Sequence, residues 1–129
     1  IGVNDVSHEL TQGCGVTPQK VSKIYSMLIE EIKEALPEIK IIILEPFVLK
    51  GTATTELWEQ FNCEVRKLAE VSKQVAEQFS LRFVPLQAEF DKASSDGDTR
   101  YWSVDGIHPT SAGHQIIKEE LQKAIEEIL

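Results

Sequence analysis

The residues best suited to chemistry stand near the end of the chain, in the segment Asp105-Gly106-Ile107-His108-Pro109. Histidine is the side chain whose unperturbed pKa lies nearest neutrality, so His108 can accept a proton and return it. A carboxylate three residues earlier, Asp105, could fix the tautomer of the imidazole and stabilise the imidazolium that forms. The same residue types also serve as ordinary turn and cap residues, because Asp favours turns and Pro favours the first helical position. The segment therefore predicts either an acid–base pair or a plain helix start.

A second set of polar residues stands at the other end of the chain, in Ile1-Gly2-Val3-Asn4-Asp5. We predict that these residues end a strand and run into a loop. Gly2 would let the backbone approach closely, and Asn4 would offer a neutral amide as a hydrogen-bond donor. Asp5 is expected to bond nearby backbone or to help hold Asn4 in place.

Together the two segments resemble those of the SGNH, or GDSL-like, hydrolase family. In that family a Gly-x-Asn-Asp block supplies an oxyanion-hole Asn, and a late Asp-x-x-His block supplies the acid and base of a catalytic triad. Gly2, Asn4 and Asp5 match the first block, and Asp105 and His108 match the second. The resemblance implies Ser-dependent hydrolysis of acyl esters without a metal or organic cofactor. It gives catalytic roles to Asp105 and His108, the oxyanion hole to Asn4, and supporting roles to Gly2 and Asp5.

The resemblance also shows what the chain lacks. The family's nucleophilic Ser lies in a Gly-Asp-Ser block near its N-terminus, and a second oxyanion-hole residue, a Gly, lies in the next block; neither block is present. We therefore expect residues 1–129 to be the C-terminal portion of a single SGNH-hydrolase-like domain. The N-terminal segment would then belong to the same protein or to a separate chain, and without it the chain would self-associate. The alternative is a truncated or degenerate α/β domain that has no catalytic role and serves binding or assembly.

The order of apolar patterns predicts the fold class. Thr17-Pro18 begins an amphipathic helix that ends at Pro37, and the β-branched run 39–44 predicts a strand covered on both faces. The segment 6–16 is polar and rich in glycine and is expected to be a loop. Further elements follow: a helix from about 55 to 79, a short strand over 81–86, a short helix over 87–93, and a final helix after His108. This alternation predicts a three-layer α/β/α sandwich with a parallel sheet, and the resemblance implies the flavodoxin-like form of it.

Composition restricts the partners of the chain. The formal net charge is −8, which disfavours nucleic acid and anionic membranes as partners. No apolar run approaches the length that spans a bilayer. A small acyl ester, such as an acetylated carbohydrate, is the partner that the resemblance suggests. No metal site is expected, because His114 falls six residues after His108 and off its helical face.

Three other residues, Cys14, Glu45 and Trp102, have two readings each. Cys14 and Cys63 are expected to be free thiols, although Cys14, between two glycines, could be an alternative nucleophile. Glu45 ends the predicted strand and either lines the ligand cleft or bonds to the loop that follows. Trp102 either anchors the loop before Asp105 or faces the substrate.

Overall fold

The computed structural model describes residues 2–129, and Ile1 lies outside the described residues. Helices and strands alternate after two initial helices. In chain order the elements are α1 (Val3–Gln12), α2 (Pro18–Ala35), β1 (Ile42–Leu44), α3 (Trp58–Gln78), β2 (Arg82–Val84), α4 (Gln87–Ala93), the short 3₁₀ helix η1 (Thr99–Tyr101) and α5 (Ser111–Ile128).

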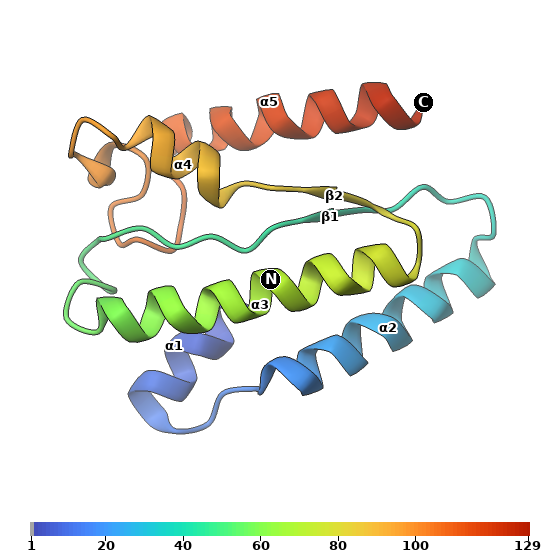
Figure 1. The fold of residues 1–129 in the computed structure, drawn as a ribbon, viewed down its shortest axis with the longest axis horizontal. Coiled ribbons are helices and arrows are strands. Elements are labelled where there is room, and N and C mark those ends of the chain that lie inside the picture. Colours follow the sequence, from blue (N-terminus) through green and yellow to red (C-terminus); the bar gives the residue numbers. More distant parts are fainter. Residues whose placement is uncertain (1) are drawn as a thin grey trace.

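The sheet is the middle of three layers. Strands β1 and β2 are parallel, with Ile43 opposite Phe83 at the centre of the ladder. Helices α4 and α5 lie on one side of the strands, and α3, with α2 beyond it, lies on the other (Figure 1). The predicted three-layer α/β/α sandwich with a parallel sheet is therefore confirmed.

The strands are shorter than the sequence predicts. The predicted runs 39–44 and 81–86 are reduced to three residues each, Ile42–Leu44 and Arg82–Val84. Glu45 continues the ladder by one bond, from its N–H to the carbonyl of Val84 at 2.9 Å. Pro85 has no N–H to donate, and this limits β2 at its C-terminal end.

The prediction for the first residues was wrong. Residues 3–12 form helix α1, where a strand end and then a loop were expected. Val3, Val6 and Leu10 recur at three- and four-residue spacing, which places them on one helical face. That face packs in an apolar cluster whose buried members include Phe61, Val65 and Leu68 of α3. Tertiary packing thus stabilises a helix in a segment whose polar, glycine-rich composition suggested a loop.

Apolar clusters hold both faces of the sheet. On one face the buried cluster joins β2, the segment after β1, α4 and α5, and the rings of Phe47 and Phe90 stack with centroids 3.9 Å apart. On the other face Ile43 packs with Ile29 of α2 and with Val75 and Ala76 of α3. Together the two clusters hold the strands between the helical layers, and the loops that leave the C-terminal ends of the strands form the site described next.

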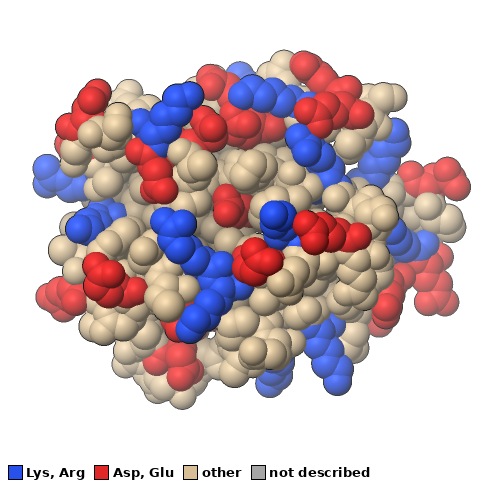
Figure 2. Space-filling model, in the orientation of Figure 1, with Lys and Arg blue, Asp and Glu red and all other residues tan. Residues whose placement is uncertain are grey.

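The surface carries charges of both signs. Figure 2 shows Lys and Arg side chains interspersed with Asp and Glu over one face of the molecule, with no continuous band of one sign. Within residues 2–129, no helix is both long enough and apolar enough to cross a membrane.

Candidate active site

Asp105 and His108 form a close pair in the loop that precedes α5. The ring Nδ1 of His108 lies 2.6 Å from Asp105 Oδ2. The His108 side chain is 71% exposed, whereas that of Asp105 is 33% exposed. The pair therefore engages one ring nitrogen and leaves the other, Nε2, available on an exposed ring.

The second oxygen of Asp105 is held by the backbone. Asp105 Oδ1 accepts hydrogen bonds from the N–H groups of Ile107 at 2.9 Å and His108 at 2.8 Å. Partial burial raises the pKa of Asp105. The hydrogen bonds from the His108 ring and from the two backbone amides, together with the charge of His108, outweigh that effect and lower the pKa from 3.8 to about 2. The carboxylate is therefore ionised at neutral pH and oriented toward the imidazole.

The loop after β1 supports the backbone of this pair. The N–H groups of Leu49, Thr52 and Ala53 donate to the carbonyls of Gly106, Val104 and Asp105 at 2.9, 3.1 and 3.1 Å. Gly51 packs so closely that an added Cβ would lie 2.2 Å from the carbonyl carbon of Asp105. Three ladder-like hydrogen bonds and a glycine contact thus join segments 49–53 and 104–106.

Ser103 closes the same loop from inside. Its side chain is fully buried. The hydroxyl donates to the carbonyl of His108 at 2.8 Å and accepts from the N–H of Gly106 at 3.0 Å. Sequence reasoning missed Ser103, although a small polar residue two positions before the Asp is the type that binds turn backbone.

Trp102 anchors the loop where it meets the helical layer. Its Nε1 donates to the carbonyl of Ala93 at 3.1 Å, and the ring packs against the cluster that contains Phe90. Thr110 then caps α5, because its hydroxyl accepts from the N–H of Gly113 at 3.2 Å. Of the two readings of Trp102, the structure shows the anchoring one.

The first residues of the chain and the loop that precedes α5 line one pocket. A pocket of about 270 Å³ is lined by Gly2 and Asn4 on one side and by His108 on the other. Its remaining wall includes Glu45 and Pro46, which follow β1. The sequence-predicted residues Gly2, Asn4 and His108 thus line the same cavity. Asp105 does not line it, but its carboxylate contacts the His108 ring.

Asn4 stands in the first turn of α1, and its side chain is exposed. The first N–H groups of a helix lack intrahelical acceptors and form the positive end of the helix dipole, so this end of α1 favours negative charge. Asp5 lies in the same turn and does not line the pocket. Its carboxylate makes no hydrogen bond to any other described residue, so the structure gives Asp5 no contact that would hold Asn4.

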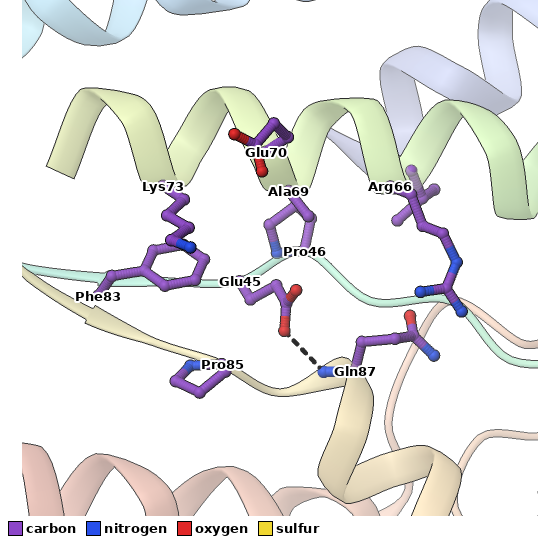
Figure 3. Close-up of a pocket in the computed structure, with 10 residues that line it drawn as sticks. Glu45, Pro46, Arg66, Ala69, Glu70, Lys73, Phe83, Pro85 and Gln87 are labelled. Atoms are coloured by element: carbon purple, nitrogen blue, oxygen red, sulfur yellow. Dashed lines mark hydrogen bonds between the residues drawn. The ribbon is translucent and has the colours of Figure 1, made fainter. Parts of the chain in front are cut away.

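Glu45 is held by hydrogen bonds from a distant segment of the chain and not by the loop that follows it. Its Oε2 accepts from the N–H groups of Leu86 and Gln87 at 2.6 and 2.8 Å, at the start of α4 rather than in the following loop. Figure 3 shows Glu45 directed at Gln87, in a second cleft of about 410 Å³ between α3 and the strand ends. Glu45 lines both this cleft and the pocket that contains His108.

The cysteines lie outside the His108 pocket. Cys14 and Cys63 are free and exposed. Cys14 follows the C-terminal end of α1, whose ten residues place it about 15 Å along the axis from the end that carries Asn4. In residues 2–129, no group of three or more His, Cys, Asp or Glu side chains is arranged to hold a metal ion.

Comparisons with known proteins agree on one group. The sequence model of the GDSL-like lipase/acylhydrolase family matches residues 1–116. Among solved structures, a protein from Parabacteroides merdae described as a GDSL-like lipase is 34% identical, with a TM-score of 0.88 over 96% of this chain. Axe2, an acetylxylan esterase from Geobacillus stearothermophilus, is 25% identical, with a TM-score of 0.80 over 97% of this chain.

The chain covers 56% of each of these two solved structures, a little more than half of their length. LAE5, an α/β hydrolase from the metagenome of Lake Arreo, shares the fold at 23% identity, with a TM-score of 0.80 and coverage of 96% of this chain and 56% of its own. No protein with a curated function matches the chain. Catalytic mutants of Axe2 replace a Ser, an Asp, or a His three residues after that Asp by Ala.

Proposed function

The chain belongs to the GDSL-like lipase/acylhydrolase family, and we propose that it supplies the acid–base pair and an oxyanion donor of a Ser-dependent ester hydrolase. The observation that carries the proposal is the contact of 2.6 Å between His108 Nδ1 and Asp105 Oδ2, beside a pocket that Asn4 also lines. The spacing of the pair equals that of the Asp and His replaced in the catalytic mutants of Axe2.

In the proposed reaction, His108 Nε2 removes the proton of a Ser hydroxyl as the Ser Oγ attacks the ester carbonyl carbon. The carbonyl π electrons move to oxygen, and the oxyanion accepts a hydrogen bond from the Asn4 amide at the positive end of α1. The oxyanion then collapses, the C–O bond to the leaving oxygen breaks, and His108 gives its proton to that oxygen, so that the alcohol departs and an acyl-enzyme remains. Water next attacks the acyl carbon as His108 removes its proton, and collapse of this second oxyanion breaks the bond to the Ser Oγ, which takes the proton from His108 as the carboxylic acid departs. Throughout, Asp105 holds the ring tautomer and stabilises the imidazolium.

We place the nucleophile upstream of residue 1, so that residues 1–129 are the C-terminal portion of the catalytic domain. No Gly-Asp-Ser block occurs in the chain. In Axe2 the Ser replaced in the catalytic mutant precedes the Asp by more residues than precede Asp105 here. The substrate class that fits is a small acyl ester, and the acetylxylan esterase activity named for Axe2 supports an acetylated carbohydrate.

The test is replacement of His108 by Ala in the full-length natural protein, with p-nitrophenyl acetate as substrate. We expect kcat to fall by roughly 10³-fold or more with an unchanged circular dichroism spectrum, because the nucleophile loses its base. His114→Ala is the matched control, since His114 is exposed on α5 and outside the pocket. Unchanged turnover in the folded His108→Ala protein would remove His108 from the mechanism. A full-length wild type that hydrolyses no ester would favour the non-catalytic alternative.

A further inference from the structure

A polar groove of about 510 Å³ lies beside the Asp105 loop and has no part in the proposed proton transfer. One wall is the segment 50–55 that follows β1, and the other is the segment 96–100 that precedes and includes most of η1. The groove is lined by hydroxyl, carboxylate, cationic and glycine residues, without an aliphatic or aromatic side chain. A ligand there would be recognised through hydrogen bonds rather than through burial of apolar surface.

The charges of the groove cancel. Lys50 and Arg100 face it together with Asp96 and Asp98, and Arg100 Nε lies 3.3 Å from Asp98 Oδ1. A strongly anionic or cationic ligand would meet a like charge for each opposite one. A neutral ligand that both donates and accepts hydrogen bonds avoids this penalty, and a polyhydroxylated ring has that property.

Several side chains in the groove retain free hydrogen-bonding capacity, among them Asp96 and Thr52, and the Lys50 Nζ lies 5.5 Å from the centroid of the Trp58 ring. Within residues 2–129, the Asp96 carboxylate and the Thr52 hydroxyl bond to no other protein group. Thr55 and Thr99 are already engaged, since their hydroxyls donate to the carbonyls of Gly51 and Lys50. A carboxylate accepts two hydrogen bonds from neighbouring hydroxyls, and such charge-assisted bonds are stronger than neutral ones. Asp96 and Thr52 are thus suited to the vicinal hydroxyls of a sugar.

The groove adjoins the backbone of the loop that carries Asp105. Gly51, which lines it, packs against the backbone of Asp105, and the N–H of Thr52 donates to the carbonyl of Val104 at 3.1 Å.

We propose that the groove is a subsite for a neutral sugar unit of an O-acetylated oligosaccharide whose ester carbonyl lies at His108. This inference rests on the proposed ester hydrolysis and extends it, because it assigns a place to the part of the substrate that does not react. Binding at a remote subsite raises kcat/KM for the oligosaccharide and leaves a substrate without sugar units unaffected.

The test uses the full-length protein and two measurements. The first is calorimetric binding of unacetylated xylotetraose, which requires no catalysis. The second is the ratio of kcat/KM for acetylated xylotetraose to that for p-nitrophenyl acetate. The variants are Asp96→Ala and Thr52→Val, with Glu38→Ala as the matched control. Glu38 is exposed and precedes β1, at the opposite end of the strands from the site.

We expect wild type to bind xylotetraose and Asp96→Ala to weaken binding about ten- to a hundredfold, with a smaller loss in Thr52→Val. The kcat/KM ratio should fall in parallel, while turnover of p-nitrophenyl acetate stays within about twofold. Absence of xylotetraose binding by wild type, or equal binding by wild type and Asp96→Ala, would overturn the subsite. Binding that is lost in Asp96→Ala in a protein that hydrolyses no ester would support the subsite and contradict the proposed function instead.

Discussion

The stability that comes from packing between the Asp105 loop and segment 49–54 can be measured by comparing alanine substitutions at two glycines, Gly106 and Gly97. Gly106 has φ of +91° and Gly97 has φ of +104°, so alanine is strained at both positions. A Cβ on Gly97 would meet nothing within 4 Å. A Cβ on Gly106 would lie 2.3 Å from the carbonyl oxygen of Leu49 and 2.4 Å from Thr54 Oγ1. Both substitutions therefore introduce backbone strain from the positive φ, and only Gly106→Ala also introduces a steric clash with Leu49 and Thr54.

The expected magnitudes follow from these contacts. The left-handed conformation of an alanine destabilises by about 1–2 kcal/mol, which is the whole expected effect of Gly97→Ala. In Gly106→Ala the clashing atoms cannot move apart easily, because Thr54 Oγ1 donates to that Leu49 oxygen at 2.6 Å. The loops must separate, which breaks two or three of the hydrogen bonds that join segments 49–53 and 104–106. At about 1 kcal/mol for each bond, Gly106→Ala should lose about 2–3 kcal/mol more than Gly97→Ala.

The assay is equilibrium unfolding of the full-length protein in urea, followed by tryptophan fluorescence and circular dichroism. A lower midpoint with an unchanged slope identifies a loss of stability. Gly106→Ala should also reduce ester turnover, since the displaced backbone is that of Asp105. Free energies of unfolding for the two variants that agree within about 0.5 kcal/mol would refute the idea that packing between these loops sets the position of Asp105.

Three further predictions concern single side chains. Asn4→Ala should lower kcat roughly 10²- to 10³-fold with little change in KM, since an oxyanion donor acts in the transition state; a raised KM with unchanged kcat would make Asn4 a binding residue. The lowered pKa of Asp105 means that its stabilising contribution is present above pH 3.8 and is lost as the pH falls toward about 2. Urea midpoints of wild type should therefore fall more steeply between pH 4 and pH 2 than those of Asp105→Asn, and parallel profiles would contradict this. Cys14→Ser should leave turnover unchanged, because Cys14 lies outside the pocket; inactivation would restore Cys14 as a nucleophile.

Local patterns predicted most of the elements. The helix predicted from Thr17-Pro18 is present as α2, and the Thr17 hydroxyl accepts from the N–H of Lys20 at 3.4 Å. The Asp105–His108 contact could also be predicted from the sequence, because only two residues of a tight turn, Gly106 and Ile107, separate its partners. Helix caps and short turns are formed by residues that are close in sequence, so their hydrogen bonds can be predicted without knowledge of the fold.

What the sequence did not predict depends on contacts between distant residues. Helix α1 (Val3–Gln12) is stabilised by packing against α3, which begins only at Trp58, and its own composition favours a loop. The role of Gly51 follows from its contact with Asp105, and the two are joined by no sequence pattern. Glu45 does not bond to the loop that follows it, because its donors are the N–H groups of Leu86 and Gln87 at the start of α4, whereas the alternative reading, that it lines the ligand cleft, agrees with its place in the His108 pocket. Such contacts form between segments that are distant in sequence, so no periodic pattern of residues along the chain predicts them.

The hydrogen bonds that set the acid–base pair come from segments 49–54 and 103–108, and the segment 94–98 contributes none of them. That segment nevertheless forms part of the wall of the polar groove. Insertions, deletions and substitutions in 94–98 can therefore accumulate without disturbing the imidazole, whereas changes in 103–108 cannot. The architecture separates what can vary during evolution from what must stay fixed, and a library of variants restricted to 94–98 is a rational starting point for changing substrate preference while keeping turnover.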